Sequence, residues 1–156
     1  AGWLPGYIQY FAAQARHIKG EIITSDRPNE NILMYKMPLG VCAGIMPWNF
    51  PLFLIGRKVA PALVTGNTVV LKASSDCPNG AYEFAKVVAE SSLPKGVINV
   101  ITGPGGVTGD ALCANKKVAM ISMTGSTEVG KKIMANAART SRRCRWSWAA
   151  SPRTSS

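Results

Sequence analysis

The sequence predicts an α/β fold: a parallel, Rossmann-like sheet with flanking helices, preceded by a helix and a β-hairpin. From Gly40 onwards, short apolar runs alternate with helical stretches, in a β-then-α order that repeats four times. The runs are apolar throughout, which is typical of strands buried on both faces and therefore of parallel sheets. At 156 residues and 47% hydrophobic content, the chain can form one core. The predicted strands span residues 41–46, 68–72, 97–102 and 118–123, and the predicted helices 51–65, 78–92, 107–114 and 126–138.

Two simpler elements are predicted before this alternating region. Aromatic residues at helical spacing predict an amphipathic helix in residues 1–19. Residues 20–38 contain two β-type runs, 21–24 and 32–37, separated by turn-forming residues, which predicts a β-hairpin. We expect both elements to serve packing and not chemistry.

Proline and glycine mark the ends of the helices in the alternating region. Pro51 sets φ for the first turn of one helix, and Gly66 with Asn67 ends it. Pro78 opens the next helix, which carries Phe84 on its apolar face. These signals define the β-then-α units.

The net charge of +10 is uneven along the chain. Residues 1–138 carry 13 lysines and arginines against 8 acids, a balance of +5, and residues 139–156 add five arginines and no acid. In the first part the basic residues are scattered singly among acids and form no stripe. We therefore expect no nucleic-acid partner for residues 1–138.

Composition also argues against a membrane or metal protein. No stretch reaches the roughly 18 uninterrupted apolar residues of a membrane span, and no signal-peptide pattern opens the chain. The four cysteines form no CxxC pair, and His17 is the single histidine, so we expect neither a metal site nor a disulfide framework. We expect no membrane partner and a cytoplasmic location.

A parallel sheet covered by helices is a nucleotide-binding architecture, whose ligands bind at the carboxyl ends of the strands. Asn49 lies just after one predicted strand, where its amide could stabilise an oxyanion or cap the helix that follows. Lys72 ends another apolar strand, where its ammonium could bind a ribose hydroxyl or a phosphate, or extend into solvent.

Two glycine-containing segments follow the later strands. Residues 103–109 nearly match GxGxxG, but the third glycine comes one position late and the segment does not follow the first strand, which disfavours a standard Rossmann dehydrogenase. Residues 125–132 nearly match the phosphate loop of NTPases, but Lys132 supplies no hydroxyl for Mg²⁺. What remains is an anion site suited to a pyrophosphate, formed by helix-terminal amides and the Ser126 hydroxyl.

Five segments carry a resemblance to a known family. They are Met-Pro-Trp-Asn-Phe-Pro (46–51), Pro-Ala-Leu-Val-Thr-Gly-Asn-Thr-Val-Val-Leu-Lys (61–72), Leu-Pro-Lys-Gly-Val-Ile-Asn-Val (93–100), Gly-Pro-Gly-Gly-Val-Thr-Gly (103–109) and Thr-Gly-Ser-Thr-Glu-Val-Gly (124–130). In this order and at these spacings, they resemble the aldehyde dehydrogenase superfamily, over nearly all of residues 2–138. Residues 20–28 look most like its lactaldehyde/glycolaldehyde dehydrogenase branch. The resemblance implies NAD(P)-dependent oxidation of a small-molecule aldehyde to a carboxylic acid.

The resemblance also implies a role for each matching residue. Asn49 would donate to the oxyanion formed from the aldehyde, Lys72 would bind the adenosine ribose, and Ser126 the pyrophosphate. Met46 and Trp48 would line the nicotinamide side. The residues implied in cofactor binding are Ile45, Met46, Pro47, Trp48, Lys72, Ser75, Gly105, Gly109, Gly125, Ser126 and Val129.

One departure concerns the choice of cofactor. NAD-preferring members usually have a glutamate three residues after the lysine, where this chain has Ser75. Because a serine does not repel a 2′-phosphate, we expect NAD or NADP, with a relaxed preference. The resemblance further implies that residues 20–38 are the oligomerisation element of a homo-oligomer, and that residues 39–138 are the NAD(P)-binding segment of an incomplete domain.

Residues 139–156 depart from the family. The nucleophilic cysteine and the general-base glutamate that the mechanism needs are not in place, and a basic stretch without periodicity stands where Leu-Glu-Leu-Gly-Gly-Lys is expected. One choice of codons for residues 140–151, read one base earlier after an added A, encodes Asn-Ile-Thr-Lys-Val-Ser-Leu-Glu-Leu-Gly-Gly-Lys. We interpret residues 139–156 as a non-native tail that is frameshifted from about residue 140, and we expect the partial chain to be inactive by itself. The alternatives are a basic RNA- or membrane-binding tail, and a non-catalytic dinucleotide-binding or subunit-interaction fragment.

Overall fold

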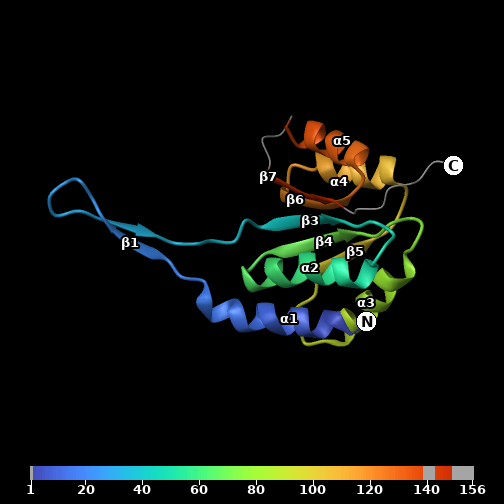
Figure 1. The fold of residues 1–156 in the computed structure, drawn as a ribbon, viewed down its shortest axis with the longest axis horizontal. Helices are drawn as coiled ribbons and strands as arrows, with labels where there is room; N and C mark the ends of the chain where they lie inside the picture. The colour runs from blue at the N-terminus through green and yellow to red at the C-terminus, as the bar shows by residue number, and fades with distance from the viewer. Residues whose placement is uncertain (1, 139–142, 149–156) are drawn as a thin grey trace.

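The computed structural model describes residues 2–138 and 143–148, and its centre is a five-stranded parallel sheet with helices on both faces (Figure 1). The prediction of an α/β fold with a parallel sheet is confirmed. The strands are β3 (Val41–Ile45), β4 (Thr68–Lys72), β5 (Ile98–Ile101), β6 (Val118–Gly125) and β7 (Arg143–Trp148). The helices of this part are α2 (Pro51–Val64), α3 (Asn79–Glu90), α4 (Asp110–Ala114) and α5 (Thr127–Ala138), with a π-helical turn, η2 (Gly105–Gly109), before α4.

The strand order is β5-β4-β3-β6-β7, so the chain starts in the middle of the sheet and builds outwards in two directions. Strands β4 and β5 extend the sheet on one side of β3, and β6 and β7 extend it on the other. The loops that leave β3 and β6 therefore diverge. In open α/β sheets this reversal of strand order is where ligands bind.

Each face of the sheet has its own hydrophobic core. Helices α4 and α5 cover one face, while α2 and α3 cover the other (Figure 1). The first core contains Ala43, Ile45, Leu112, Cys113, Val118, Ile121, Met123, Ile133 and Ala137. The second contains Met46, Leu54, Ile55, Val59, Val69, Leu71, Ala73 and Ala81.

The N-terminal helix α1 (Trp3–Gln14) packs against the outer side of α2. The Tyr7 and Phe53 rings meet edge-on with centroids 5.7 Å apart. The absence of a side chain at Gly56 makes room for Leu4. The helix is shorter than the predicted segment 1–19, because a 3-10 turn, η1 (Ala15–His17), follows it and the backbone is extended at Ile18.

The predicted hairpin is present and projects from the body as an arm (Figure 1). Strands β1 (Glu21–Thr24) and β2 (Asn31–Met34) pair antiparallel, and all of their residues are exposed. The second strand ends before the predicted residue 37. The buried Asn67 ties the base of the arm to the body, because its Oδ1 accepts hydrogen bonds from the Leu39 and Gly40 amides at 2.6 and 3.0 Å.

Strand β7 lies within residues 139–156, the stretch in which the sequence shows no periodicity. Residues 143–148 pair in parallel with β6, with Cys144 against the core of the α4/α5 face and Arg143 and Arg145 exposed. The alternation was hidden because the outward positions are arginines instead of neutral polar residues. The rest of this tail, residues 139–142 and 149–156, lies outside the described residues.

None of the helices in the described part of the chain is long and apolar enough to cross a membrane. Within residues 2–138 and 143–148, no three His, Cys, Asp or Glu side chains gather as metal ligands would.

Candidate functional site

The carboxyl ends of the central strands form one row along an edge of the sheet. Ile45 at the end of β3 is in register with Lys72 of β4 and with Met123 of β6. Lys72 is in turn in register with Ile101 of β5. The segments that follow these strands contain the predicted site residues, so the fold brings them to the same edge.

Asn49 does not cap the helix that follows it. The N-cap residue of α2 is Phe50, and no side chain caps this helix. The Asn49 Oδ1 atom is buried and has no hydrogen-bond partner among the described residues. The N-cap alternative is therefore wrong. No hydrogen bond within the described residues occupies the Asn49 Oδ1 atom.

The backbone directly after Asn49 is strained. Phe50 adopts a left-handed conformation, with φ 51° and ψ 45°, although it is neither glycine nor asparagine. Such a conformation costs on the order of 1–2 kcal/mol for an ordinary residue. It turns the chain sharply from the end of β3 into α2, and strain of this kind is concentrated at functional sites.

Lys72 is a buried lysine, 4% exposed, at the end of β4. Its side chain lies on the α4/α5 face, because it is two residues from Val70, which packs against that core. Burial lowers the pKa of Lys72, and the nearby Asp76 carboxylate partly opposes this. The ammonium makes no hydrogen bond within the described residues. The side-chain stem is therefore buried, and the ammonium is suited to donate to a ligand's hydroxyls; the alternative of an ammonium that extends into solvent stays open.

Ser75 joins the two loops beside Lys72. Its Oγ donates to the Gly103 carbonyl at 2.9 Å, which links the loop after β4 to the glycine segment after β5. The side chain is exposed. Since the hydroxyl proton is used in this bond, the oxygen lone pairs remain able to accept.

In residues 103–109 the fold requires a glycine at some positions and not at others. Gly103 has a φ of +136°, and a Cβ there would collide with the Thr108 hydroxyl. At Gly105, Gly106 and Gly109, by contrast, φ is not positive and a Cβ would meet no atom within 4 Å. Neither packing nor backbone conformation explains the glycine at these three positions. A glycine at such a position would let a ligand approach the backbone closely.

The N-terminus of α5 provides an anion site at the end of β6. Ser126 stands at the start of the helix, where its carbonyl accepts from the Gly130 amide at 3.0 Å. Its exposed hydroxyl oxygen accepts a hydrogen bond from the Val129 amide at 3.4 Å. The first amides of a helix favour negatively charged groups. Gly125, just before, is closely packed, because a Cβ there would come 2.7 Å from the Met123 side chain.

The other predicted cofactor residues are placed on both sides of the sheet edge. Ile45 is buried in the core of the α4/α5 face, and Met46 in the core of the α2 face. The Met46 amide donates to the Lys72 carbonyl at 3.1 Å, which extends the pairing of the two strands. Pro47 is half-buried, and Trp48 is 55% exposed.

Lys58 was not singled out by the sequence analysis. It is 8% exposed, although it carries a charge. Its Nζ donates to Ser122 Oγ at 3.1 Å and to Thr124 Oγ1 at 3.0 Å, both on β6. The sequence does contain a signal for its burial, because Lys58 has the helical spacing of the apolar residues Ile55 and Val59 on the buried side of α2.

The donor set at the sheet edge fits a dinucleotide. The ammonium of Lys72 is unbonded, glycines with open space line the loop beside it, and a helix N-terminus with a serine hydroxyl lies at the end of β6, on the other side of β3. These are donors for ribose hydroxyls and a pyrophosphate.

Comparison with known proteins gives a consistent result. Residues 4–147 match the model of the aldehyde dehydrogenase family. Lactaldehyde dehydrogenase of Escherichia coli is 59% identical over 133 residues, which are 85% of this chain and 28% of that protein. D-glyceraldehyde dehydrogenase (NADP(+)) of Thermoplasma acidophilum is 48% identical, over 83% of this chain and 26% of that protein.

Solved structures show the same likeness. The crystal structure of lactaldehyde dehydrogenase from Escherichia coli superposes with a TM-score of 0.92 at 54% identity, over 94% of this chain and 31% of that one. Betaine aldehyde dehydrogenase from Staphylococcus aureus in complex with NAD+ superposes with a TM-score of 0.90 at 37% identity, over 93% of this chain and 29% of that one. The chain therefore spans less than a third of the length of these relatives.

Proposed function

Because this chain belongs to the aldehyde dehydrogenase family, with the resemblance to its lactaldehyde branch confirmed, we propose that it is the NAD(P)-binding part of an enzyme that oxidises an aldehyde to a carboxylic acid. The observation that carries this is the edge of the sheet. There the unbonded ammonium of Lys72, the open glycines and the N-terminus of α5 lie at the carboxyl ends of β4, β5 and β6, with β3 between β4 and β6.

Each of these groups has a defined task in the proposal. Lys72 donates to the hydroxyls of the adenosine ribose, and the α5 amides with the Ser126 hydroxyl hold the pyrophosphate. Gly105 and Gly109 let the backbone approach the adenine. Asn49 donates from its amide to the oxygen that becomes negative when the aldehyde is attacked. The cofactor, when bound, supplies a nicotinamide ring that accepts hydride.

Calorimetric titration of the chain with NAD and NADP tests this proposal. We expect saturable binding that is at least tenfold weaker in Lys72→Met and in Gly105→Ala. Gly6→Ala is the matched control, because Gly6 lies on α1, away from the sheet edge, its φ is not positive and a Cβ there would meet no atom within 4 Å. Loss of binding in the control alone, or no binding by a folded wild-type chain, would overturn the assignment.

We further propose a relaxed cofactor preference, because Ser75 adds no negative charge beside the ribose site. A carboxylate there would accept from both ribose hydroxyls of NAD and would repel the 2′-phosphate of NADP. One relative, D-glyceraldehyde dehydrogenase (NADP(+)), has NADP(+) in its name, which is compatible with a relaxed preference. We expect wild-type affinities for the two cofactors within about tenfold, and a shift towards NAD in Ser75→Glu. A hundredfold preference of the wild type for NAD would contradict the proposal.

We propose in addition that the chain by itself does not oxidise aldehydes. The family's chemistry needs a cysteine thiolate and a general-base glutamate, and we interpret residues from about 140 as read from a neighbouring frame. An assay with lactaldehyde or glycolaldehyde and either cofactor should show binding without turnover. Turnover would refute the interpretation, and so would a gene in which the neighbouring frame does not encode the glutamate segment.

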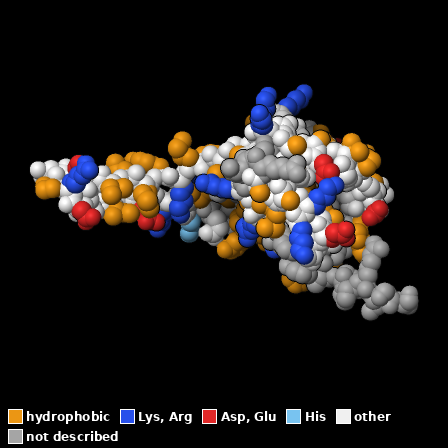
Figure 2. Space-filling model, turned by 90° about the horizontal axis from the view of Figure 1, so that it is seen from above, with side chains coloured by type: hydrophobic (Ala, Val, Ile, Leu, Met, Phe, Trp, Pro, Cys, Tyr) orange, Lys and Arg blue, Asp and Glu red, His pale blue; other side chains and the backbone are white. Residues whose placement is uncertain are grey.

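We propose that the hairpin is the subunit-contact element of a homo-oligomer. Its apolar side chains lie on an arm with little else to cover them, and Figure 2 shows them gathered along it. Ile22, Leu33 and Tyr35 are 76%, 55% and 77% exposed. Contiguous exposed apolar surface of this kind marks interaction sites. Light scattering should give a mass above that of one chain, falling towards one chain in Leu33→Lys. A wild-type chain that remains monomeric at high concentration would contradict the role.

A further inference from the structure

An ion pair joins α4 to α5 beside the groups assigned to the cofactor. The Lys132 ammonium on α5 donates to the Asp110 carboxylate on α4, with Nζ and Oδ2 2.7 Å apart. The Lys132 side chain is 58% exposed and the Asp110 side chain 35%. The two helices lie side by side on one face of the sheet (Figure 1). The pair therefore bridges two elements at the surface of the molecule.

The acidic end of the pair is continuous with the glycine segment, residues 103–109. Asp110 directly follows Gly109, and its backbone amide donates to the Val107 carbonyl inside that segment. The space beside Gly105 and Gly109 is open, because a Cβ there would meet no atom within 4 Å. A movement of Asp110 would therefore carry the end of the glycine segment with it.

The basic end of the pair belongs to the helix whose first turn is assigned to the pyrophosphate. Lys132 lies three residues after Val129, on the same side of α5. The Ser126 carbonyl accepts from the Gly130 amide at 3.0 Å, which closes the first turn. Because these backbone bonds hold the helix together, a shift of Lys132 is transmitted to Ser126.

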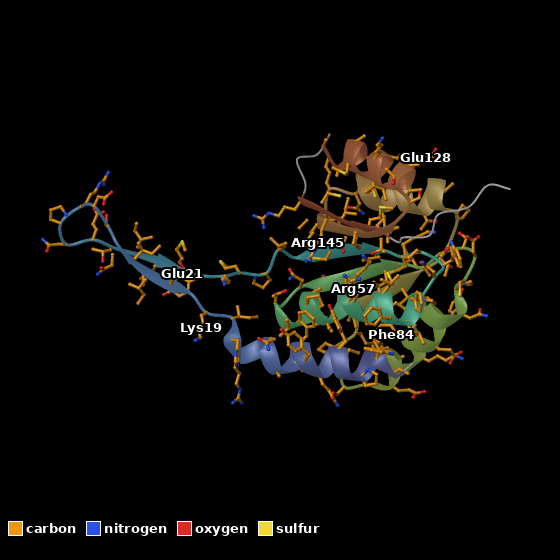
Figure 3. All side chains as sticks on the ribbon, viewed as in Figure 1. Lys19, Glu21, Arg57, Phe84, Glu128 and Arg145 are labelled. Atoms are coloured by element: carbon orange, nitrogen blue, oxygen red, sulfur yellow. The ribbon has the colours of Figure 1, made fainter. Side chains whose placement is uncertain are left out.

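Lys132 pairs with another helix although its own helix offers an acid. Glu128 lies four residues earlier, at the spacing with which a glutamate and a lysine pair on a helix surface. Figure 3 shows Glu128 at the outer side of this helix layer, away from the sheet. Within the described part of the chain, the ion pair of Lys132 is with Asp110. The fold therefore favours the bridge over the local pair.

The bridge is not needed to hold the two helices on the sheet. Leu112 and Cys113 of α4 share a core with Ile133 and Ala137 of α5. These apolar contacts lie on the side of the helices that faces the sheet, and an exposed ion pair adds little to stability. The pair lies on the exposed side instead, where it limits how far the two helices can separate.

We propose that Asp110 and Lys132 are positioning residues for cofactor binding. Their ion pair fixes the distance between the glycine segment and the start of α5, so that the groups assigned to the adenine and to the pyrophosphate are already correctly spaced. Spacing that is set before binding lowers the cost of ordering these groups. This inference rests on the proposed function, because both residues act on the same site without touching the cofactor.

Calorimetric titration of the full chain with NAD tests this role, because charge and spacing predict different results. By charge alone, Lys132→Met would weaken binding of the negative pyrophosphate and Asp110→Asn would strengthen it. If the pair sets the spacing, both variants bind more weakly. We expect about three- to fivefold weaker binding in each, the range that an exposed ion pair can supply. Urea denaturation should show both variants folded, with midpoints close to that of the wild type.

Two neighbouring residues of α5 provide matched controls. Lys131→Met and Glu128→Gln remove the same charges from exposed side chains. Because exposed charges are screened by salt, each control should change NAD affinity by less than about twofold. Controls that weaken binding as much as Lys132→Met and Asp110→Asn do would refute the positioning role.

The exchanged pair, Asp110→Lys combined with Lys132→Asp, restores the bridge with its charges reversed. We expect its NAD affinity to return to within about twofold of the wild type. Stronger or unchanged binding in Asp110→Asn would overturn this inference alone, and so would an exchanged pair that binds no better than the single variants. No binding of NAD by the folded wild type would overturn the proposed function and this inference together.

Discussion

The two faces of the sheet each hold a buried lysine, and they use it differently. Lys72 is 4% exposed and Lys58 is 8% exposed, and burial lowers the pKa of both. Lys72 stands at a strand end, has Asp76 near it and makes no hydrogen bond among the described residues. Lys58 reaches from α2 to the carboxyl-end part of β6, bonds two hydroxyls there and has only arginines as charged neighbours. Burial of a lysine alone therefore does not define its role, because the surrounding groups decide which ligand it can take.

The largest expected effect tests whether the two faces form one cooperative unit. Ile121 in the α4/α5 core and Leu71 in the α2 core are both 0% exposed. Alanine at either position removes fully buried methyl groups and leaves a cavity, which costs about 2–5 kcal/mol of unfolding free energy. Urea denaturation should show one transition that moves to lower urea in both variants.

The control for these core variants is Val87→Ala on α3, because Val87 is 65% exposed and lies outside the proposed subunit-contact element. It should change the unfolding free energy by less than about 0.5 kcal/mol. If Ile121→Ala and Leu71→Ala instead produced two separate transitions, the two faces would be independent units.

The next effect sharpens the contrast between the two lysines. The folded-state pKa of Lys58, about 8, lies below its ordinary value of 10.5. Between these values the unfolded chain binds the extra proton, so the free energy of unfolding rises with pH across this window. The full effect is at most about 3 kcal/mol. Below pH 8, Lys58→Met should therefore be more stable than the wild type.

Thermal unfolding from pH 7 to 10.5 measures this difference. The advantage of Lys58→Met should shrink as pH rises through 8, because the wild-type lysine loses its charge. Cys42 lies on the same face of β3, and burial raises its thiol pKa. Cys42 titrates in both the wild type and Lys58→Met, and the charges of Arg57 and Arg145 are also present in both proteins. These groups therefore cancel in the difference between the two. A constant difference across the whole range would contradict the buried charge.

A smaller effect distinguishes glycines that serve the fold from those that serve a ligand. Gly103→Ala places a Cβ against Thr108 at a φ of +136°, so it should cost about 1–3 kcal/mol of unfolding free energy. Gly105→Ala meets no atom and should change stability by less than about 0.5 kcal/mol. Chemical denaturation of both variants gives the comparison. Equal losses would mean that Gly105 is also a structural glycine.

The smallest effect concerns the strained turn on the α2 side. Phe50 is 76% exposed, so it contributes little packing to offset its left-handed backbone. Asparagine tolerates this conformation better, and Phe50→Asn should stabilise the chain by up to about 1 kcal/mol. The midpoint of urea denaturation reports the change. A clear destabilisation would show that the Phe50 ring packs more strongly than its exposure indicates.

Much of the fold was predictable because its signals are local. Strand β4 has the predicted bounds, residues 68–72, and α2 begins at Pro51 as predicted. The left-handed Gly66, with φ +78°, ends α2 where glycine was expected to end it. The family follows from five short motifs in order, and the matches confirm it.

Other features depended on contacts between distant segments. The N-terminal helix ended early, and the bond between Ser75 and Gly103 links residues 28 positions apart. Strand β7 formed because β6 offers an unpaired edge and because Cys144 fits the α4/α5 core. None of these could be read from local composition.

What the sequence by itself determined is the order of β and α units, the family, and the residues at the strand ends. Apolar runs, prolines and glycines act over a few residues, so their effect is written directly in the chain. What only the tertiary structure decided is the environment of each lysine. The strand order placed Lys72 beside the glycine segment, and the missing side chain of Gly44 let Lys58 pass to the hydroxyls of β6. A charged group's solvation and partners are set by all the segments that surround it, and these meet only when the chain is folded.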